Sequence, residues 1–92
     1  MASSTTALYV ATVAKKISVS AVLRLLGRNV RAARVTAGLT QEAAAARARI
    51  DYKRWQRIEQ GSVNVTVRTL VRIATVLNAS FWDLHRPHIG HE

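Results

Sequence analysis

The sequence contains no cysteine, a single proline and only five acidic residues among its 92 positions. The lack of cysteine excludes disulfides, thiolate zinc sites and thiol nucleophiles. No apolar run approaches the eighteen residues that a membrane-spanning helix needs, and the longest candidate, residues 7–14, ends at Lys15. The first fourteen residues carry no charge, whereas a secretory signal begins with basic residues. We therefore expect a cytosolic protein.

Acidic residues are also scarce relative to basic ones: 14 Lys and Arg against 5 Asp and Glu give a net charge of +9. No fold requires such an excess, so it predicts a polyanionic partner, either nucleic acid or an anionic membrane. A membrane-surface peptide would present arginines opposite a continuous exposed apolar face, whereas the apolar stripes of this chain can pack against one another. No membrane partner is expected, and the length suits one compact domain.

Catalytic machinery is missing as well. The sequence has no paired carboxylates, no phosphate-binding glycine loop and no nucleophile with a positioned base, so we expect neither an enzyme nor a cofactor. His85, His88 and His91 recur every three residues. Pro87 would interrupt a helix that aligned them and no fourth ligand is near, so no metal site is predicted.

The spacing of apolar residues predicts a first amphipathic helix over about residues 22–37, with Gly38 as its C-terminal stop. Its inward stripe would consist of Val22, Leu23, Leu26, Val30, Ala33 and Ala37. Arg24, Arg28 and Arg31 fall on the opposite arc, and Arg34 lies at the edge of the apolar face, where it should be partly buried.

Two short helices joined by a tight turn are predicted next. Thr40 is a suitable N-cap for a helix through Ala48, whose inward residues would be small alanines, Ala44, Ala45 and Ala48. Asp51 would cap the following helix through Gln60, and Gly61 would end it.

The remaining folded segment is predicted to be helical too. Thr66 would cap a helix with the buried stripe Val67, Leu70, Val71, Ala74 and Leu77, and Ser80 would cap a final turn in which Phe81 and Leu84 close the core. The predicted fold is a compact all-α, five-helix domain over residues 21–85, followed by a polar tail, 86–92. Residues 1–20 form an N-terminal arm, either disordered or a strand that pairs with a second copy of the chain.

The helix of residues 52–60 has one apolar side, Trp55 and Ile58, and one polar side, Lys53, Gln56, Arg57 and Gln60, with Tyr52 and Arg54 at the margins. An α-helix fits the major groove of B-DNA, where Lys and Arg match guanine edges and Gln matches adenine. For an isolated helix, an ordinary solvated face would explain the same residues.

The surrounding residues favour the DNA-binding interpretation. The segment GLTQEAAAARARIDYKRWQRIEQG resembles the helix-turn-helix of lambda-repressor-like (Cro/C1, XRE-type) DNA-binding domains, and the resemblance extends over residues 26–84. Its markers are Arg34, the run 38–41, Ala45, the Ile58-Glu59-x-Gly61 ending and residues 70–77. The sequence departs from the family at Arg49, where a turn glycine is common, at Val65, often proline, and at Ala44, usually a larger aliphatic residue.

The resemblance implies roles for individual residues. Base contacts would come from the recognition helix: Tyr52, Lys53, Gln56 and Arg57. Contacts to the DNA backbone would come from the flanking segments: Thr40, Gln41, Arg49, Arg54 and Asn64. Arg34 and Glu59 would form a structural ion pair.

The resemblance further implies a sequence-specific, double-stranded DNA-binding regulator of transcription, a repressor, located in the cytoplasm with the nucleoid. A single recognition helix reads few base pairs, so a homodimer is expected, formed through the N-terminal arm or the end near Trp82. The alternative is an antitoxin that binds a toxin protein and represses its own operon. A regulatory or toxin protein is accordingly a second expected partner.

Overall fold

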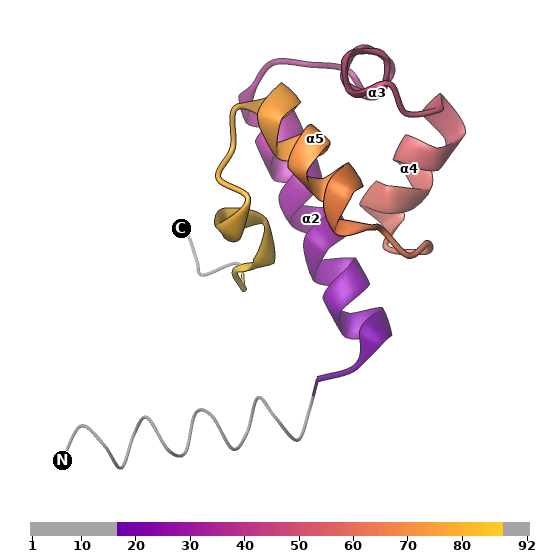
Figure 1. Ribbon diagram of the computed structural model, residues 1–92, viewed down its shortest axis with the longest axis vertical. Coiled ribbons are helices and arrows are strands. Elements are labelled where there is room, and N and C mark those ends of the chain that lie inside the picture. Colours follow the sequence, from indigo (N-terminus) through magenta and orange to yellow (C-terminus); the bar gives the residue numbers. More distant parts are fainter. Residues whose placement is uncertain (1–16, 88–92) are drawn as a thin grey trace, which may run out of the picture.

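The computed structural model describes residues 17–87, which form four α-helices and one 3-10 turn (Figure 1). The helices are α2 (Val19–Thr36), α3 (Gln41–Ala48), α4 (Tyr52–Gln60) and α5 (Val67–Leu77), followed by the 3-10 turn η1 (Trp82–His85). The predicted all-α class is confirmed, although the fifth expected helix is only a 3-10 turn. Residues 1–16 of the predicted arm and 88–92 of the predicted tail lie outside the described residues.

Side-chain caps fix where the helices begin. The hydroxyl of Thr40 accepts a hydrogen bond from the backbone N–H three residues later, and so does that of Thr66, as predicted for N-caps. The carboxylate of Asp51, the third predicted cap, accepts hydrogen bonds from two backbone N–H groups of α4. Ser18 caps α2 in the same way, so α2 begins about one turn before the predicted start at residue 22. The predicted cap at Ser80 was wrong: the cap position of η1 is Phe81, without a side-chain hydrogen bond, while the Ser80 carbonyl accepts two backbone N–H groups.

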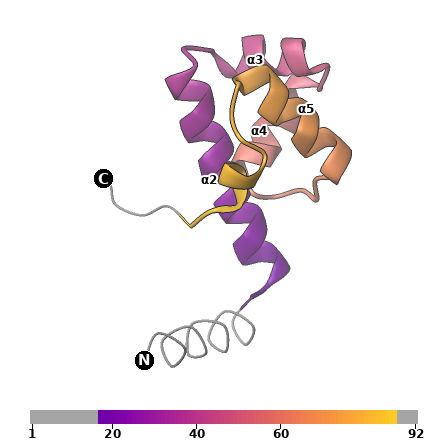
Figure 2. The same ribbon diagram turned by 60° about the vertical axis from the view of Figure 1, so that its left-hand side comes forward.

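Helix α2 is the longest element: α4, α5 and η1 pack against it, and α3 packs against α4 and α5 (Figures 1 and 2). Helix α2 packs most extensively against α4 on one side and η1 on another. The largest side chains with almost no exposure are Trp55, Ile58, Ile73, Leu84 and Val30. The Asn29 amide donates to the carbonyls of Leu84 (2.8 Å) and Arg86 (2.7 Å), which fastens η1 onto α2.

The predicted inward stripes need two corrections. In α5, Val67 and Val71 are 66% and 48% exposed, and Ile73, which the prediction omitted, is fully buried. The buried face is Leu70, Ile73, Ala74 and Leu77, and at about 100° per residue Val71 turns away from it. At the end of α2, Ala37 is exposed because the helix stops at Thr36.

Gly27 marks the place where α2 crosses α4, a feature that the sequence interpretation missed. A Cβ at this position would contact the Glu59 carbonyl oxygen and stand 2.6 Å from that of Ile58. Only glycine allows the two backbones to approach so closely. A glycine inside a helical pattern, which is unfavourable by about 1 kcal/mol relative to alanine, was the available signal.

Candidate nucleic-acid interface

The two helices of the predicted helix-turn-helix, α3 and α4, are joined by a turn in which Arg49 adopts the left-handed conformation (φ 58°). The inward alanines of α3, at positions 44, 45 and 48, are at most 2% exposed. Ile50 in the turn is 7% exposed. Small inward side chains let α3 lie close to its neighbours but bury little apolar area, so burial alone stabilises its position only weakly.

A polar network centred on Glu59 provides further stabilisation of the position of α3. Its carboxylate accepts hydrogen bonds from Arg34 Nε (2.6 Å) and Nη2 (3.1 Å), Gln41 Nε2 (2.9 Å) and Trp55 Nε1 (2.7 Å). Arg34 Nη1 also donates to the Leu39 carbonyl at 2.9 Å. The network thereby ties α2, α3 and α4 together at one point.

The charges of this network are mutually stabilised. The side chains of Arg34 and Glu59 are only 12% and 4% exposed. Burial alone would raise the pKa of Glu59, but the hydrogen bonds from Arg34, Gln41 and Trp55 and the charge of Arg34 lower it below its usual value. The hydrogen bond to Glu59 raises the pKa of Arg34. Both groups are therefore ionised at neutral pH, and Glu59 presents no free negative charge.

The outward face of α4 is polar and accessible. Tyr52, Lys53 and Arg57 are exposed and Gln56 is half-buried, while Trp55 and Ile58 are buried on the opposite side. The Asp51 carboxylate is occupied by the backbone N–H groups of Lys53 and Arg54 at 3.1 and 3.3 Å. The accessible face therefore offers hydrogen-bond donors and acceptors with excess positive charge.

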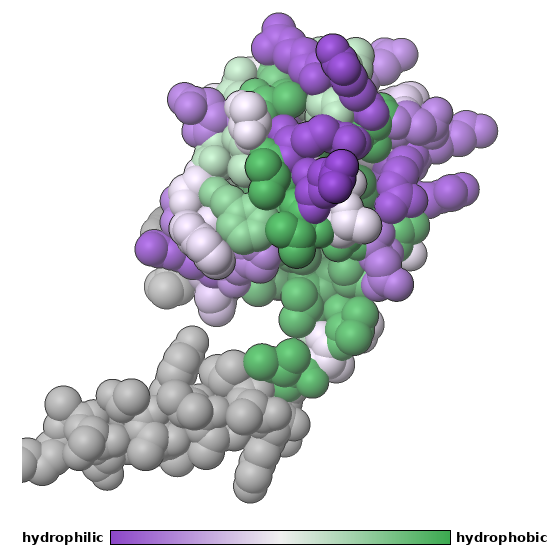
Figure 3. Space-filling view, in the orientation of Figure 1, coloured by the Kyte–Doolittle hydropathy of each residue, from purple (hydrophilic) through white to green (hydrophobic). Residues whose placement is uncertain are grey.

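A hollow of about 570 Å³ lies between α4, the C-terminal half of α2 and the start of α3. Its lining includes Tyr52, Thr40 and Gln41, three of the predicted contact residues, and also Arg31, Arg34, Glu42, Glu59 and Gln60. Hydrophilic side chains project along the upper and right-hand edges in Figure 3, where α3 and α4 lie in Figure 1. The structure thus gathers three of the predicted contact residues at one hollow.

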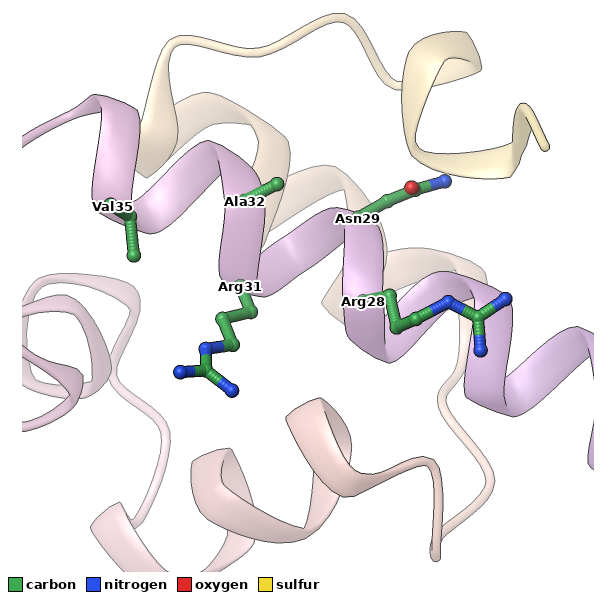
Figure 4. Close-up of a pocket in the computed structure, with 5 residues that line it drawn as sticks. All are labelled: Arg28, Asn29, Arg31, Ala32 and Val35. Carbon is green, nitrogen blue, oxygen red and sulfur yellow. The ribbon is translucent and has the colours of Figure 1, made fainter. Parts of the chain in front are cut away.

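Arg31 is an addition to the predicted site. The sequence predicted that Arg31 lies on the outward arc of α2 but not which element this arc faces. In the structure its side chain extends toward α3 and α4, away from Asn29 and η1 (Figure 4). The signal for this placement was its position one helical turn before Arg34.

Arg54 and Asn64 also lie together, because Arg54 Nη2 donates to the Asn64 carbonyl at 3.1 Å. Both are exposed; Arg54 lies in the first turn of α4, and Asn64 lies in the loop that follows the helix. Arg49 is placed differently from the other predicted backbone contacts. It lines a separate groove with Arg47, Ala48 and four residues of α5, and this groove shares no residue with the hollow beside α4.

Two further features concern the described part of the chain. Between residues 17 and 87, no group of three His, Cys, Asp or Glu side chains is arranged to hold a metal ion; His88 and His91 lie outside this range. Within the same range, no helix combines the length and the apolar character that crossing a membrane requires.

Residues 25–86 match the family model of the helix-turn-helix domain. The restriction-modification controller protein C.AhdI from Aeromonas hydrophila is 29% identical, with a TM-score of 0.65 over 67% of this chain and 94% of that chain. The clp gene regulator ClgR from Corynebacterium glutamicum is 25% identical, with a TM-score of 0.67 over 68% and 67% of the two chains.

An HTH_3 family transcriptional regulator from Vibrio cholerae is also 25% identical, with a TM-score of 0.69 over 73% of this chain and 38% of that chain. No curated protein matches the sequence. The fold is that of the lambda-repressor-like regulators, as the sequence resemblance predicted, and the chain belongs to the helix-turn-helix domain family.

Proposed function

We propose that this protein is a transcriptional regulator that binds double-stranded DNA by inserting α4 into the major groove. The observation that carries the proposal is the outward face of α4, where Tyr52, Lys53, Gln56 and Arg57 stand with no free carboxylate among them. Lys and Arg can donate to guanine edges, and a Gln amide can pair with adenine. These four residues are the proposed base contacts.

The proposed contacts to the sugar-phosphate backbone flank this face on both sides. Arg31, Thr40 and Gln41 line the hollow beside α4. Arg54, in the first turn of α4 and at the other margin of the face, is hydrogen-bonded to Asn64 in the loop after the helix. Gln41 donates one amide hydrogen to Glu59, which orients its side chain and leaves its second N–H and its oxygen available. Backbone contacts of this kind position a protein on DNA without reading sequence.

We further propose that the protein acts as a homodimer and a repressor. One recognition helix reads too few base pairs to be specific, and two copies related by two-fold symmetry double the sequence that is read. The structurally similar proteins support regulation as the role: C.AhdI is a restriction-modification controller protein and ClgR is a clp gene regulator.

The test is selection of bound fragments from a random double-stranded DNA pool at about 150 mM salt, where non-specific binding fades. We expect enrichment of a palindrome whose half-sites are centred about one helical turn, roughly 34 Å, apart. Enrichment of a single half-site would remove the dimer from the proposal. Absence of any enriched motif would contradict sequence-specific binding and favour the alternative, an antitoxin whose main partner is a toxin protein.

A further inference from the structure

A second surface of the domain carries charge that the proposed DNA contact does not use. Between the end of α3 and the outer side of α5 lies a groove of about 300 Å³, lined by Arg47, Ala48, Arg49, Val71, Arg72, Thr75 and Val76. None of these residues belongs to α4 or to the hollow beside it. The groove is therefore distinct from the proposed DNA-reading face.

The groove combines an apolar floor with a basic rim. Ala48 is buried, Val76 is half-buried, and Val71 is 48% exposed; Val67, one turn before it on α5, extends the exposed apolar strip. Arg47, Arg49 and Arg72 are all exposed and lie along the same groove. Within residues 17–87, none of these three arginines forms an ion pair with an acidic side chain.

Arg49 occupies a conformation that disfavours it. Four residues of the described chain have positive φ: Gly38, Gly61, Asn78 and Arg49. Glycine adopts this region freely and asparagine tolerates it, whereas for other side chains it is unfavourable by roughly 1–2 kcal/mol. The left-handed turn ends α3, because the backbone N–H groups of Arg49 and Ile50 donate to the carbonyls of Ala46 (3.2 Å) and Ala45 (2.9 Å). The Arg49 side chain donates no hydrogen bond to another described residue. The backbone requirement for this turn would be met better by glycine, and the arginine adds a guanidinium without a described partner to the groove.

We infer that this groove docks an acidic, amphipathic segment of a partner protein. Apolar side chains of the segment would cover Val71 and Val76, and its carboxylates would pair with Arg47, Arg49 and Arg72, since guanidinium groups suit bidentate pairing with carboxylates. Because the groove and the hollow beside α4 share no residue, such a partner can bind while α4 contacts DNA. A regulator with this surface would bring a second protein to the DNA site.

The inference is tested with a phage-displayed library of random peptides, selected on the full chain at about 150 mM salt to weaken unspecific charge attraction. We expect enriched peptides that combine Asp or Glu with Leu, Ile or Phe. The affinity of a synthesised, fluorescein-labelled peptide from the selection is then measured by anisotropy on Arg49→Gly, Arg72→Gln and Val71→Ser. The matched control is Arg28→Gln, which removes the same charge at a position of α2 that does not line this groove.

We expect Arg49→Gly, Arg72→Gln and Val71→Ser each to weaken peptide binding by about fivefold or more. Arg28→Gln should change it less than about twofold, as expected for a charge that does not line the groove and is screened by salt. Arg49→Gly is informative because glycine relieves the strained turn: its thermal midpoint should equal or exceed that of the wild type. Equal weakening by Arg28→Gln, enriched peptides without acidic residues, or no enrichment would overturn the inference. It would also fail if Arg49→Gly weakened binding to random-sequence duplex DNA and left peptide binding intact, because Arg49 would then be a DNA backbone contact.

Discussion

Replacing Glu59 with glutamine tests whether the polar network between α2, α3 and α4 determines the stability of the domain. The substitution keeps the size and shape of the side chain but removes the charge addressed by Arg34, Gln41 and Trp55. The single oxygen of a glutamine amide can accept at most two hydrogen bonds. Its amide hydrogens would then face the remaining donors, and the Arg34 guanidinium, 12% exposed, would lose its counter-charge.

The expected loss of stability is large. Removing one partner of a buried ion pair destabilises a protein by about 3–5 kcal/mol, because the other charge stays buried without compensation. A domain has a total stability of only about 5–15 kcal/mol. For a chain of this size, the same loss corresponds to a fall in Tm of more than about 12 °C.

Urea denaturation followed by far-UV circular dichroism measures this effect directly. The matched control is Asp83→Asn, because Asp83 pairs with Arg86 at 3.2 Å while both side chains remain more than half exposed. An exposed pair of this kind contributes less than about 1 kcal/mol. If Glu59→Gln reduced the free energy of unfolding no more than Asp83→Asn, the network would not hold the helices together as argued.

Acid should weaken the same ion pair, because the pKa of Glu59 is lower in the folded than in the unfolded protein. The contribution of Glu59 to the free energy of unfolding is therefore complete above its unfolded pKa of about 4.3 and is lost as the pH falls through the folded pKa. The urea midpoint should therefore drop below pH 4.5 more in the wild type than in Glu59→Gln, and parallel curves would contradict this. Gly27→Ala should lower Tm by at least about 4 °C, since its Cβ meets the α4 backbone; an unchanged Tm would place the helices farther apart. Lys53→Ala or Gln56→Ala should weaken binding to the selected DNA site by about 1–3 kcal/mol and spare random DNA, whereas equal loss on both would refute base reading. Arg31→Ala should reduce the slope of log K against log salt by about one, and an unchanged slope would place Arg31 off the DNA.

Helix limits could be predicted well from the sequence because they depend on local chemistry. Thr40, Asp51 and Thr66 cap their helices with their own side chains, and Gly61 takes the left-handed conformation that ends α4. These interactions span only a few residues. The start of α2 was less well predicted because the serine cap at Ser18 lies in a segment rich in serine and threonine, where no single residue stands out.

The rotation of α5 about its axis could not be predicted from the sequence. Apolar residues occupy seven of the eleven positions in VRTLVRIATVL, so stripes through Val71 and through Ile73 fit the helical period about equally well. The packing of α5 against α2 and α3 determines which of the two stripes is buried. Burial of Ile73 and exposure of Val71 are consequences of tertiary contacts, and the exposed Val71 is also what provides an apolar floor to the α3–α5 groove.

Within the candidate site, the pairing of Arg34 with Glu59 was expected only through family resemblance. The two residues are 25 positions apart, and no spacing rule connects side chains on different helices at that separation. The direction of Arg31 and the close approach at Gly27 likewise depend on where α4 crosses α2. Such facts follow from the packing of helices, which the periodicity of each helix alone does not specify.

The composition of α3 explains why stability and DNA reading depend on the same residues. With alanines at its inward positions, α3 buries little apolar area, and the hydrogen bond from Gln41 to Glu59 adds a second constraint on its position. That link sets the position of Gln41 and Thr40 relative to Tyr52 across the hollow. A change at Glu59 would therefore shift the backbone contacts relative to the base contacts and weaken binding to every DNA sequence. Loss of the Gln56 side chain would instead remove one base contact and leave the other contacts in place.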